Sequence, residues 1–127
     1  MKDELPSKLE IEELISNLTK VKTFWNHWKK ARSCNILVDK DGFVLTANER
    51  MCSVLGYSHD ELINKPFIDF VYLEDKQSTL DIFETISNSN SIDRFVNRYI
   101  TKQKRIVVFM WTAVQIDNNI SAIATII

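Results

Sequence analysis

The chain has 127 residues, of which 45% are hydrophobic and 26% charged, and this length accommodates one domain with a self-sufficient apolar core. The net charge of -1 gives no overall field to hold a polyanion or an anionic membrane surface, so we expect neither nucleic-acid binding nor membrane contact by this segment. No signal-peptide apolar core follows the start Met1–Glu4, and we expect a cytosolic protein.

Cysteine and histidine are sparse. Cys34 and Cys52 could pair, but without a secretion signal we expect two reduced, small hydrophobic side chains. His27 and His59 have no cysteine or histidine at metal-ligand spacing, so we expect no metal site.

The first predicted element is a helix from Ser7 to about Arg32. Ser7 and Glu10 form a capping-box pattern, and acidic residues near the start and basic residues near the end complement the helix dipole. Its apolar residues alternate in steps of three and four, which is typical of a coiled coil. This apolar stripe, the predicted dimer interface, consists of Ile11, Leu14, Leu18, Val21, Trp25 and Trp28.

The stripe needs a covering partner. Ile15 and Phe24 broaden it, and three heptads are short for a free-standing coiled coil. The alternatives are a second copy of the helix, giving a homodimer, or packing against the following domain. We expect the homodimer, because a bare helix with this apolar area would be sticky.

The second part opens with an apolar strand, residues 35–39, a turn at residues 40–42 and a second strand, residues 43–47. Asn48 is predicted to cap a short helix that Gly56 stops. Ser58 and Glu61 repeat the capping-box pattern for another short helix, which we expect Pro66 to end.

Helical turns follow, the last from about Asp75 into a polar loop at residues 87–91. Three strands then close the chain, at about residues 92–101, 105–116 and 119–127. Strands at both ends with helices between them predict an α+β fold, an antiparallel sheet with its helices on one face.

These residues resemble a PAS domain. The resemblance lies in the order of four segments, residues 36–44, Asn48, residues 55–62 and residues 72–75, with a closing hairpin around Trp111. It implies a PAS-like five-stranded antiparallel sheet around a small cavity, used for sensing or protein interaction, and an amino-terminal helix that often dimerises. We therefore expect residues 1–34 to be an N-terminal capping and coiled-coil-like dimerisation helix and residues 35–127 to be the PAS domain.

Two departures from the family pattern stand out. The usual glycine in the hairpin between the third and fourth strands is absent from residues 101–105. Many members also continue into an output module, whereas this sequence stops at Ile127, so we expect a fragment of a larger signalling protein.

No catalytic arrangement emerges from the sequence. Ser58 and His59 are neighbours at a helix start, where their side chains point in different directions and no third orienting group follows. The two glycines cannot form a phosphate-binding loop. We expect no enzyme activity.

The cofactor is left open, with none as the first expectation and a small organic ligand as the alternative. Flavin-binding blue-light members carry a reactive cysteine where this chain has residues 66–71 without one, and their flavin-holding amides correspond here to Tyr99 and Phe109. Asn97 could partly substitute. The helix that supplies a haem ligand in other members has no histidine here, so we expect neither haem nor a cysteine-adduct flavin.

Side chains two apart on a strand share a face, and this alternation together with the resemblance predicts which residues line a cavity. Leu80 and Phe83 should close it from the helix side. The sheet residues are Ile36, Val38, Phe95, Asn97, Tyr99, Phe109, Trp111, Ala113, Ala122, Ala124 and Ile126. The alternative is that these aromatic rings simply fill the core.

The resemblance implies a PAS sensory and dimerisation module, the input of a bacterial-type histidine kinase or cyclic-dinucleotide regulator, with a downstream output domain as partner. The rival is a constitutive interaction scaffold with a filled core and no ligand. A weaker rival is a redox domain that handles flavin.

Overall fold

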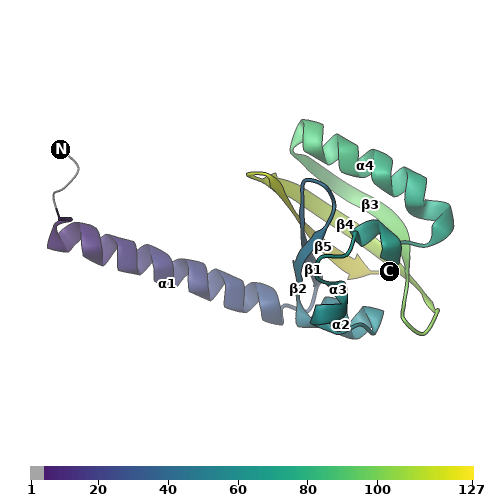
Figure 1. Ribbon diagram of the computed structural model, residues 1–127, viewed down its shortest axis with the longest axis horizontal. Coiled ribbons are helices and arrows are strands. Elements are labelled where there is room, and N and C mark those ends of the chain that lie inside the picture. Colours follow the sequence, from purple (N-terminus) through teal and green to yellow (C-terminus); the bar gives the residue numbers. More distant parts are fainter. Residues whose placement is uncertain (1–4) are drawn as a thin grey trace.

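The computed structural model describes residues 5–127, and the start at residues 1–4 lies outside the described residues. Figure 1 shows a long helix projecting from a domain in which a twisted sheet is packed against shorter helices. In chain order the elements are α1 (Lys8–Lys30), β1 (Cys34–Asp39), β2 (Val44–Ala47), α2 (Glu49–Leu55), α3 (His59–Leu62), two 3₁₀ turns (Phe67–Phe70 and Leu73–Asp75), α4 (Lys76–Ser89), β3 (Ser91–Ile100), β4 (Ile106–Ile116) and β5 (Asn119–Ile126).

The predicted antiparallel sheet is confirmed. Its strand order is β2-β1-β5-β4-β3, so the last strand lies at the centre, beside the first. Cys34 pairs with Ala124 and Asp39 with Asn119, while Trp111 pairs with both Ala124 and Phe95. Residues from both ends of the chain therefore share one inner sheet face.

The starts of the helices follow the capping patterns in the sequence. Ser7 and Glu10 form the predicted capping box of α1, and Ser58 and Glu61 form that of α3. Asn48 caps α2, which ends at Gly56 in the left-handed conformation, with φ of 79°. A Cβ atom there would lie 2.6 Å from the amide end of the Gln103 side chain, which would have to move, so the positive φ is the main reason for glycine at this position.

Several predicted boundaries are wrong. Helix α1 ends at Lys30, α3 ends at Leu62 well before Pro66, and β2 begins at Val44. Helix α4 continues to Ser89, into the segment predicted as a loop, and there the hydroxyls of Ser87 and Ser89 donate to carbonyls one turn earlier.

Lys104 takes the conformation expected of the missing hairpin glycine, with φ of 69°. Two bonds close the hairpin around it: the Arg105 N–H donates to the Thr101 hydroxyl at 3.0 Å, and the Thr101 N–H donates to the Arg105 carbonyl at 2.8 Å. The turn therefore forms without glycine, with the uncommon backbone conformation fixed by its neighbours.

Asn48 joins α1 to the domain. Its side-chain oxygen accepts from the Asn35 and Met51 N–H groups, each at 3.0 Å. Its side-chain nitrogen donates to the Trp28 carbonyl at 3.2 Å and to the Ser33 carbonyl at 2.9 Å. A single buried amide thus connects the end of α1, the start of β1 and the start of α2.

Candidate functional site

The candidate site is a cavity of about 50 Å³ between the inner face of the sheet and α4. This volume exceeds the roughly 10–15 Å³ that one water needs and falls short of the roughly 150 Å³ of an engineered cavity that binds benzene. Its lining is almost entirely apolar. In its present form the cavity therefore admits only a molecule of very few atoms.

Most of the predicted cavity residues lie around this space. Strands β1, β3, β4 and β5 contribute the inner-face side chains, and α4 contributes Phe83. The residues that were predicted and that line the cavity are Ile36, Val38, Phe83, Phe95, Asn97, Tyr99, Trp111, Ala113 and Ala122.

Four predicted cavity residues lie elsewhere. Leu80 is 42% exposed and Ile126, at the end of β5, is 46% exposed. Phe109 and Ala124 are buried in solid core beside the cavity without facing it. Leu80 does not line the cavity because α4 turns a different face toward the sheet. Leu80 lies one helical position away from that face.

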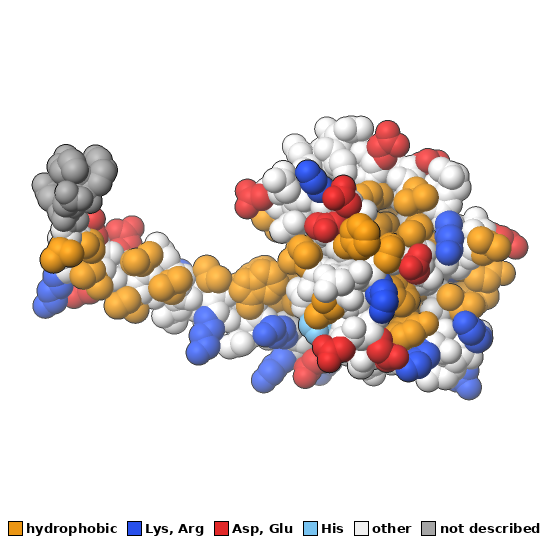
Figure 2. Space-filling model, in the orientation of Figure 1, with side chains coloured by type: hydrophobic (Ala, Val, Ile, Leu, Met, Phe, Trp, Pro, Cys, Tyr) orange, Lys and Arg blue, Asp and Glu red, His pale blue; other side chains and the backbone are white. Residues whose placement is uncertain are grey.

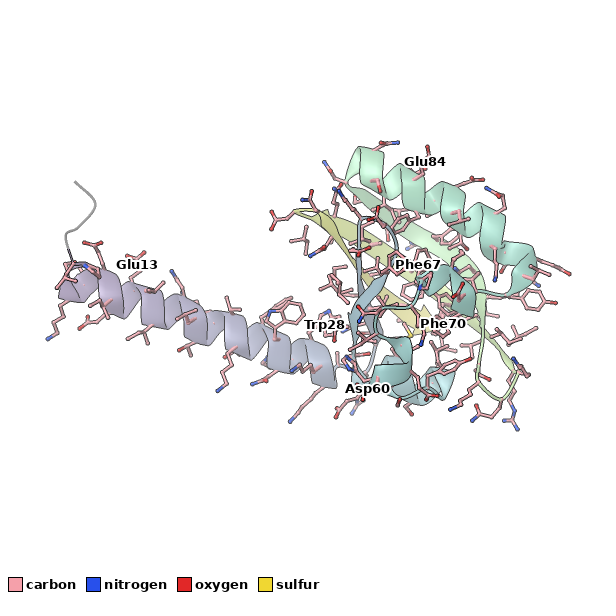
Figure 3. The ribbon with its side chains drawn as sticks, viewed as in Figure 1. Glu13, Trp28, Asp60, Phe67, Phe70 and Glu84 are labelled. Atoms are coloured by element: carbon pink, nitrogen blue, oxygen red, sulfur yellow. The ribbon has the colours of Figure 1, made fainter. Side chains whose placement is uncertain are left out.

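The sequence reasoning missed six lining residues. They are Phe67, Thr79, Ile82, Ile86, Ile92 and Ile120. The face of α4 that contains Phe83 also presents, at helical spacing, Thr79, Ile82 and Ile86. On β5, Ile120 is two residues before Ala122. The helix period and the strand period could therefore have indicated these residues. Figure 3 labels Phe67, which lies between the sheet and the helices.

A bulge in β3 explains why the alternation of side chains did not indicate Ile92 as a lining residue. The register shifts between Asp93 and Phe95, where Arg94 has φ of 63°. Strict alternation from Phe95 would place Asp93 inside, whereas the extra residue brings Ile92 onto the inner face instead. No feature of the sequence marks this bulge, because Arg94 is not a residue that favours a positive φ.

A buried polar chain crosses the cavity wall. The Trp111 indole N–H donates to the Asn97 side-chain oxygen at 2.7 Å, and the Asn97 amide donates to the Thr79 hydroxyl at 3.1 Å. These bonds link β4, β3 and α4. A ligand that moved α4 would have to stretch or break a bond inside a low-dielectric site, where unpaired polar groups are costly.

The chemistry of the lining favours neutral groups. Burial raises the pKa of the Tyr99 phenol in the lining, so this group is protonated near neutral pH. Outside the lining, burial also raises the pKa values of the Cys34 and Cys52 thiols, which are protonated as well. Both thiols are free. The Asn97 oxygen already accepts from Trp111 and the Asn97 amide donates to Thr79, so a flavin edge would have to share this side chain with both partners. Residues 5–127 contain no cluster of three or more metal-ligating side chains.

The α1 stripe is mostly uncovered. Ile11 is 43% exposed, Leu14 59%, Leu18 60% and Val21 53%. Figure 2 shows hydrophobic side chains along the projecting helix.

The carboxyl end of the stripe differs, because the chain itself covers it. Trp25 is half-buried, and Trp28, predicted to face a partner, is only 6% exposed. Its indole lies at the base of α1 beside the domain (Figure 3), and its carbonyl accepts from Asn35 and Asn48. In a single chain, Trp28 thus anchors the helix to the domain.

Two ion pairs join helical segments to β3 and to the β3–β4 hairpin. Asp75, which precedes α4, accepts from the Arg98 side chain of β3 at 2.6 and 2.9 Å, and these bonds hold its pKa below the usual range. Lys102 donates to Glu61 at 2.6 Å, and this bond, aided by the Ser58 N–H, lowers the Glu61 pKa from 4.5 to about 2. They connect α4 and α3 to the sheet.

These lowered pKa values predict acid sensitivity. Both carboxylates contribute stability above their ordinary pKa, and for Glu61 this contribution is lost as the pH falls from 4.5 through about 2. The free energy of unfolding, measured by urea titration at a series of pH values, should therefore fall over this range. Lys102→Met should flatten the curve, whereas Lys104→Met, the same change in the same hairpin, should leave its shape unchanged. Parallel curves for Lys102→Met and the unchanged protein would contradict the role of the pair.

Comparison with known proteins agrees with this architecture. The PAS fold family matches over residues 29–123, and the chain belongs to this family. None of the curated proteins matches the chain. Within residues 5–127, no helix is both long and apolar enough to cross a bilayer.

Solved structures share the fold at low sequence identity. A domain of the sensory box sensor histidine kinase/response regulator from Geobacter sulfurreducens has a TM-score of 0.76 and 18% identity, covering 85% of this chain and 95% of that one. The PAS domain of an HTR-like protein from Haloarcula marismortui has a TM-score of 0.74 and 16% identity, with coverage of 91% and 99%. The LOV protein of Rhodobacter sphaeroides has a TM-score of 0.73 and 11% identity, with coverage of 87% and 68%.

Proposed function

We propose that this chain is a PAS sensory and dimerisation module, the input of a larger bacterial-type signalling protein such as a histidine kinase or a cyclic-dinucleotide regulator. Membership of the PAS family supports the sensory role. The similar domain of a sensor histidine kinase/response regulator supports the kind of output. In this proposal residues 1–34 dimerise, residues 35–127 sense, and a downstream domain in the cytosol carries the output.

The cavity between the sheet and α4 is the observation that carries this proposal. A small, uncharged, mainly apolar molecule fits its lining, and charged ligands would lose hydration without gaining a partner there. Binding would favour one position of α4 relative to β3 and β4, because Thr79, Asn97 and Trp111 join these elements. The ligand thereby shifts populations between arrangements of the domain. No step of this mechanism requires catalysis.

Dimerisation through α1 transmits the change. The uncovered side chains from Ile11 to Phe24 are too apolar to remain in water on an isolated helix. The base of α1 is fixed to β1 and α2 through Asn48, so a movement of the sheet reaches the helix.

A constitutive scaffold is the second candidate. The observation in its favour is the volume of about 50 Å³, well below the roughly 300 Å³ at which ordinary ligand pockets begin. In that case the aromatic rings on the sheet are core, and partners bind only the outer surfaces.

Filling the cavity distinguishes these candidates. Native mass spectrometry of the full chain purified from cells should find one small molecule per chain that is lost on denaturation. Ala113→Leu adds three carbon atoms to the cavity wall and should abolish this added mass while destabilising the fold by about 1–3 kcal/mol. Thr85→Leu, at an exposed position of α4, is the matched control and should retain the molecule. If the unchanged protein carries no added mass, the scaffold is the correct function.

A further inference from the structure

One polar group in the cavity lining has no partner among the described residues. The phenol hydroxyl of Tyr99 forms no hydrogen bond within residues 5–127, although Tyr99 lines the cavity and is only 3% exposed. Burial alone, with no contribution from a hydrogen bond, raises the pKa of this phenol, so the hydroxyl keeps the proton that it can donate. A buried donor without an acceptor costs free energy, and in folded proteins it is rare.

The Tyr99 ring cannot turn to find another acceptor. Its centroid lies 5.2 Å from that of Phe109 and 5.6 Å from that of Trp111. Both of these rings are buried on β4. Close packing on this scale fixes the position of the phenol, so an acceptor has to come to the hydroxyl.

The other polar side chains of the lining are bonded to one another. The Trp111 indole N–H can only donate, so the Asn97 atom that it contacts is the side-chain oxygen. The Asn97 nitrogen therefore faces Thr79, and the Thr79 hydroxyl oxygen accepts from it. This order leaves the Thr79 hydroxyl hydrogen to donate elsewhere, and no group of residues 5–127 accepts it. The lining thus has two unpaired donors, on β3 and on α4.

A water molecule does not correct this imbalance. It would bring two more hydrogens into a lining that already has unpaired ones, whereas buried waters typically make about three hydrogen bonds. A molecule with an acceptor oxygen and no donor pairs with a hydroxyl and adds no unpaired hydrogen. Its carbon atoms would contact the isoleucine, alanine and phenylalanine side chains that form most of the lining.

We infer that the cavity ligand is a short neutral carbonyl compound, such as a ketone of the size of acetone, whose oxygen accepts a hydrogen bond from the Tyr99 hydroxyl. The inference rests on the proposed sensory function and names the chemical class of ligand for that site. The volume of about 50 Å³ corresponds to roughly three to five water-sized atoms, and acetone lies within this range. A carboxylate would bury a charge without a cationic partner in the lining.

This hydrogen bond gives the site its specificity. A hydrocarbon of the same shape would fill the space but leave the Tyr99 hydroxyl unpaired, and a site with an unpaired buried donor discriminates against such a molecule. Tyr99 is two residues after Asn97 on β3, and Asn97 is bonded to α4 through Thr79. The ligand would therefore contact the same strand that is joined to the helix.

A cycle of one variant and two probes tests the inference. Acetone and isobutene have nearly the same shape, and only acetone has an acceptor oxygen. Titrations of the full chain, followed by the NMR signals of the Trp111 indole and the Asn97 amide, give a dissociation constant for each probe. Tyr99→Phe removes only the hydroxyl. It should raise the dissociation constant for acetone at least about fivefold and change that for isobutene by less than about twofold.

The matched control is Tyr72→Phe. It makes the same chemical change in a tyrosine outside the lining, whose ring lies 4.7 Å from the Arg98 guanidinium. It should alter neither dissociation constant.

The infrared C=O stretching band of bound acetone supplies a readout that a merely structural role of Tyr99 would not move. The band should lie at lower frequency in the unchanged protein than in Tyr99→Phe. Circular dichroism checks that the variant is folded. If it is not, the band in the unchanged protein, compared with that of acetone in hexane, decides the question by itself.

Equal effects of Tyr99→Phe on the two probes, or no effect on either, overturn the inference, and so do an unshifted band and a failure of acetone to bind. The sensory function has a separate test, because it falls only when native mass spectrometry finds no added mass. An added mass that belongs to a hydrocarbon overturns the carbonyl class and leaves the sensory function standing.

Discussion

Replacing Asn48 with alanine is expected to lower the free energy of unfolding by about 3–4 kcal/mol and to release α1 from the domain. Asn48 is 1% exposed, and its amide satisfies backbone groups of Asn35, Met51, Trp28 and Ser33. Alanine leaves these groups buried without a partner and also removes the cap of α2. Urea unfolding measures the loss, and hydrogen exchange at residues 28–35 measures the release of the helix.

Two further variants make this test specific. Asn48→Asp keeps both acceptor bonds but turns a carboxylate toward carbonyl groups, so it should retain the cap of α2 while still freeing α1. Asn26→Ala, at an exposed position of α1, should change stability by less than about 0.5 kcal/mol. A loss below about 1 kcal/mol for Asn48→Ala would mean that the amide does not fix the base of α1.

Replacing Phe109 with alanine is expected to lower the free energy of unfolding by about 3–5 kcal/mol. Its ring is fully buried and lies 5.2 Å from both the Tyr99 and Trp111 rings, between centroids. Removing it leaves a hole that β4, paired on both sides with β3 and β5, cannot close by moving. Thermal and urea unfolding measure the loss.

The matched control for this change is Phe43→Ala, because Phe43 is 42% exposed. Its removal should lower the free energy of unfolding by less than about 1.5 kcal/mol, since folding buries less apolar surface at this position than at Phe109. Equal losses at the two positions would contradict the placement of Phe109 in solid core. The new space beside Trp111 should also admit a larger apolar molecule than the original cavity does.

The residues of the cavity wall could be predicted on elements whose apolar side chains fit only one inner face. On β4 the alternation Phe109, Trp111, Ala113 correctly identified the inner face, but not that Phe109 lies beyond the edge of the cavity. On α4 the apolar residues fit two stripes. The Thr79 hydroxyl bonded to Asn97 lies on the stripe that faces the sheet, and Leu80 is left outside.

Local structure could be predicted from the sequence alone: the capping boxes at Ser7 and Ser58, the stop at Gly56, the order of the strands along the chain and the resemblance to the PAS family. These depend on hydrogen bonds and side-chain periods within a few residues, which the sequence contains directly.

Three features are seen only in the folded chain: β5 lies between β1 and β4, the bulge at Arg94 turns Ile92 inward, and Trp28 is anchored at the base of α1. Each of these depends on packing between segments distant in the chain, where a shift of one residue exchanges the inner and outer faces of a strand. The size of the cavity depends on such shifts in the same way, because it is the space that all these contacts leave unfilled.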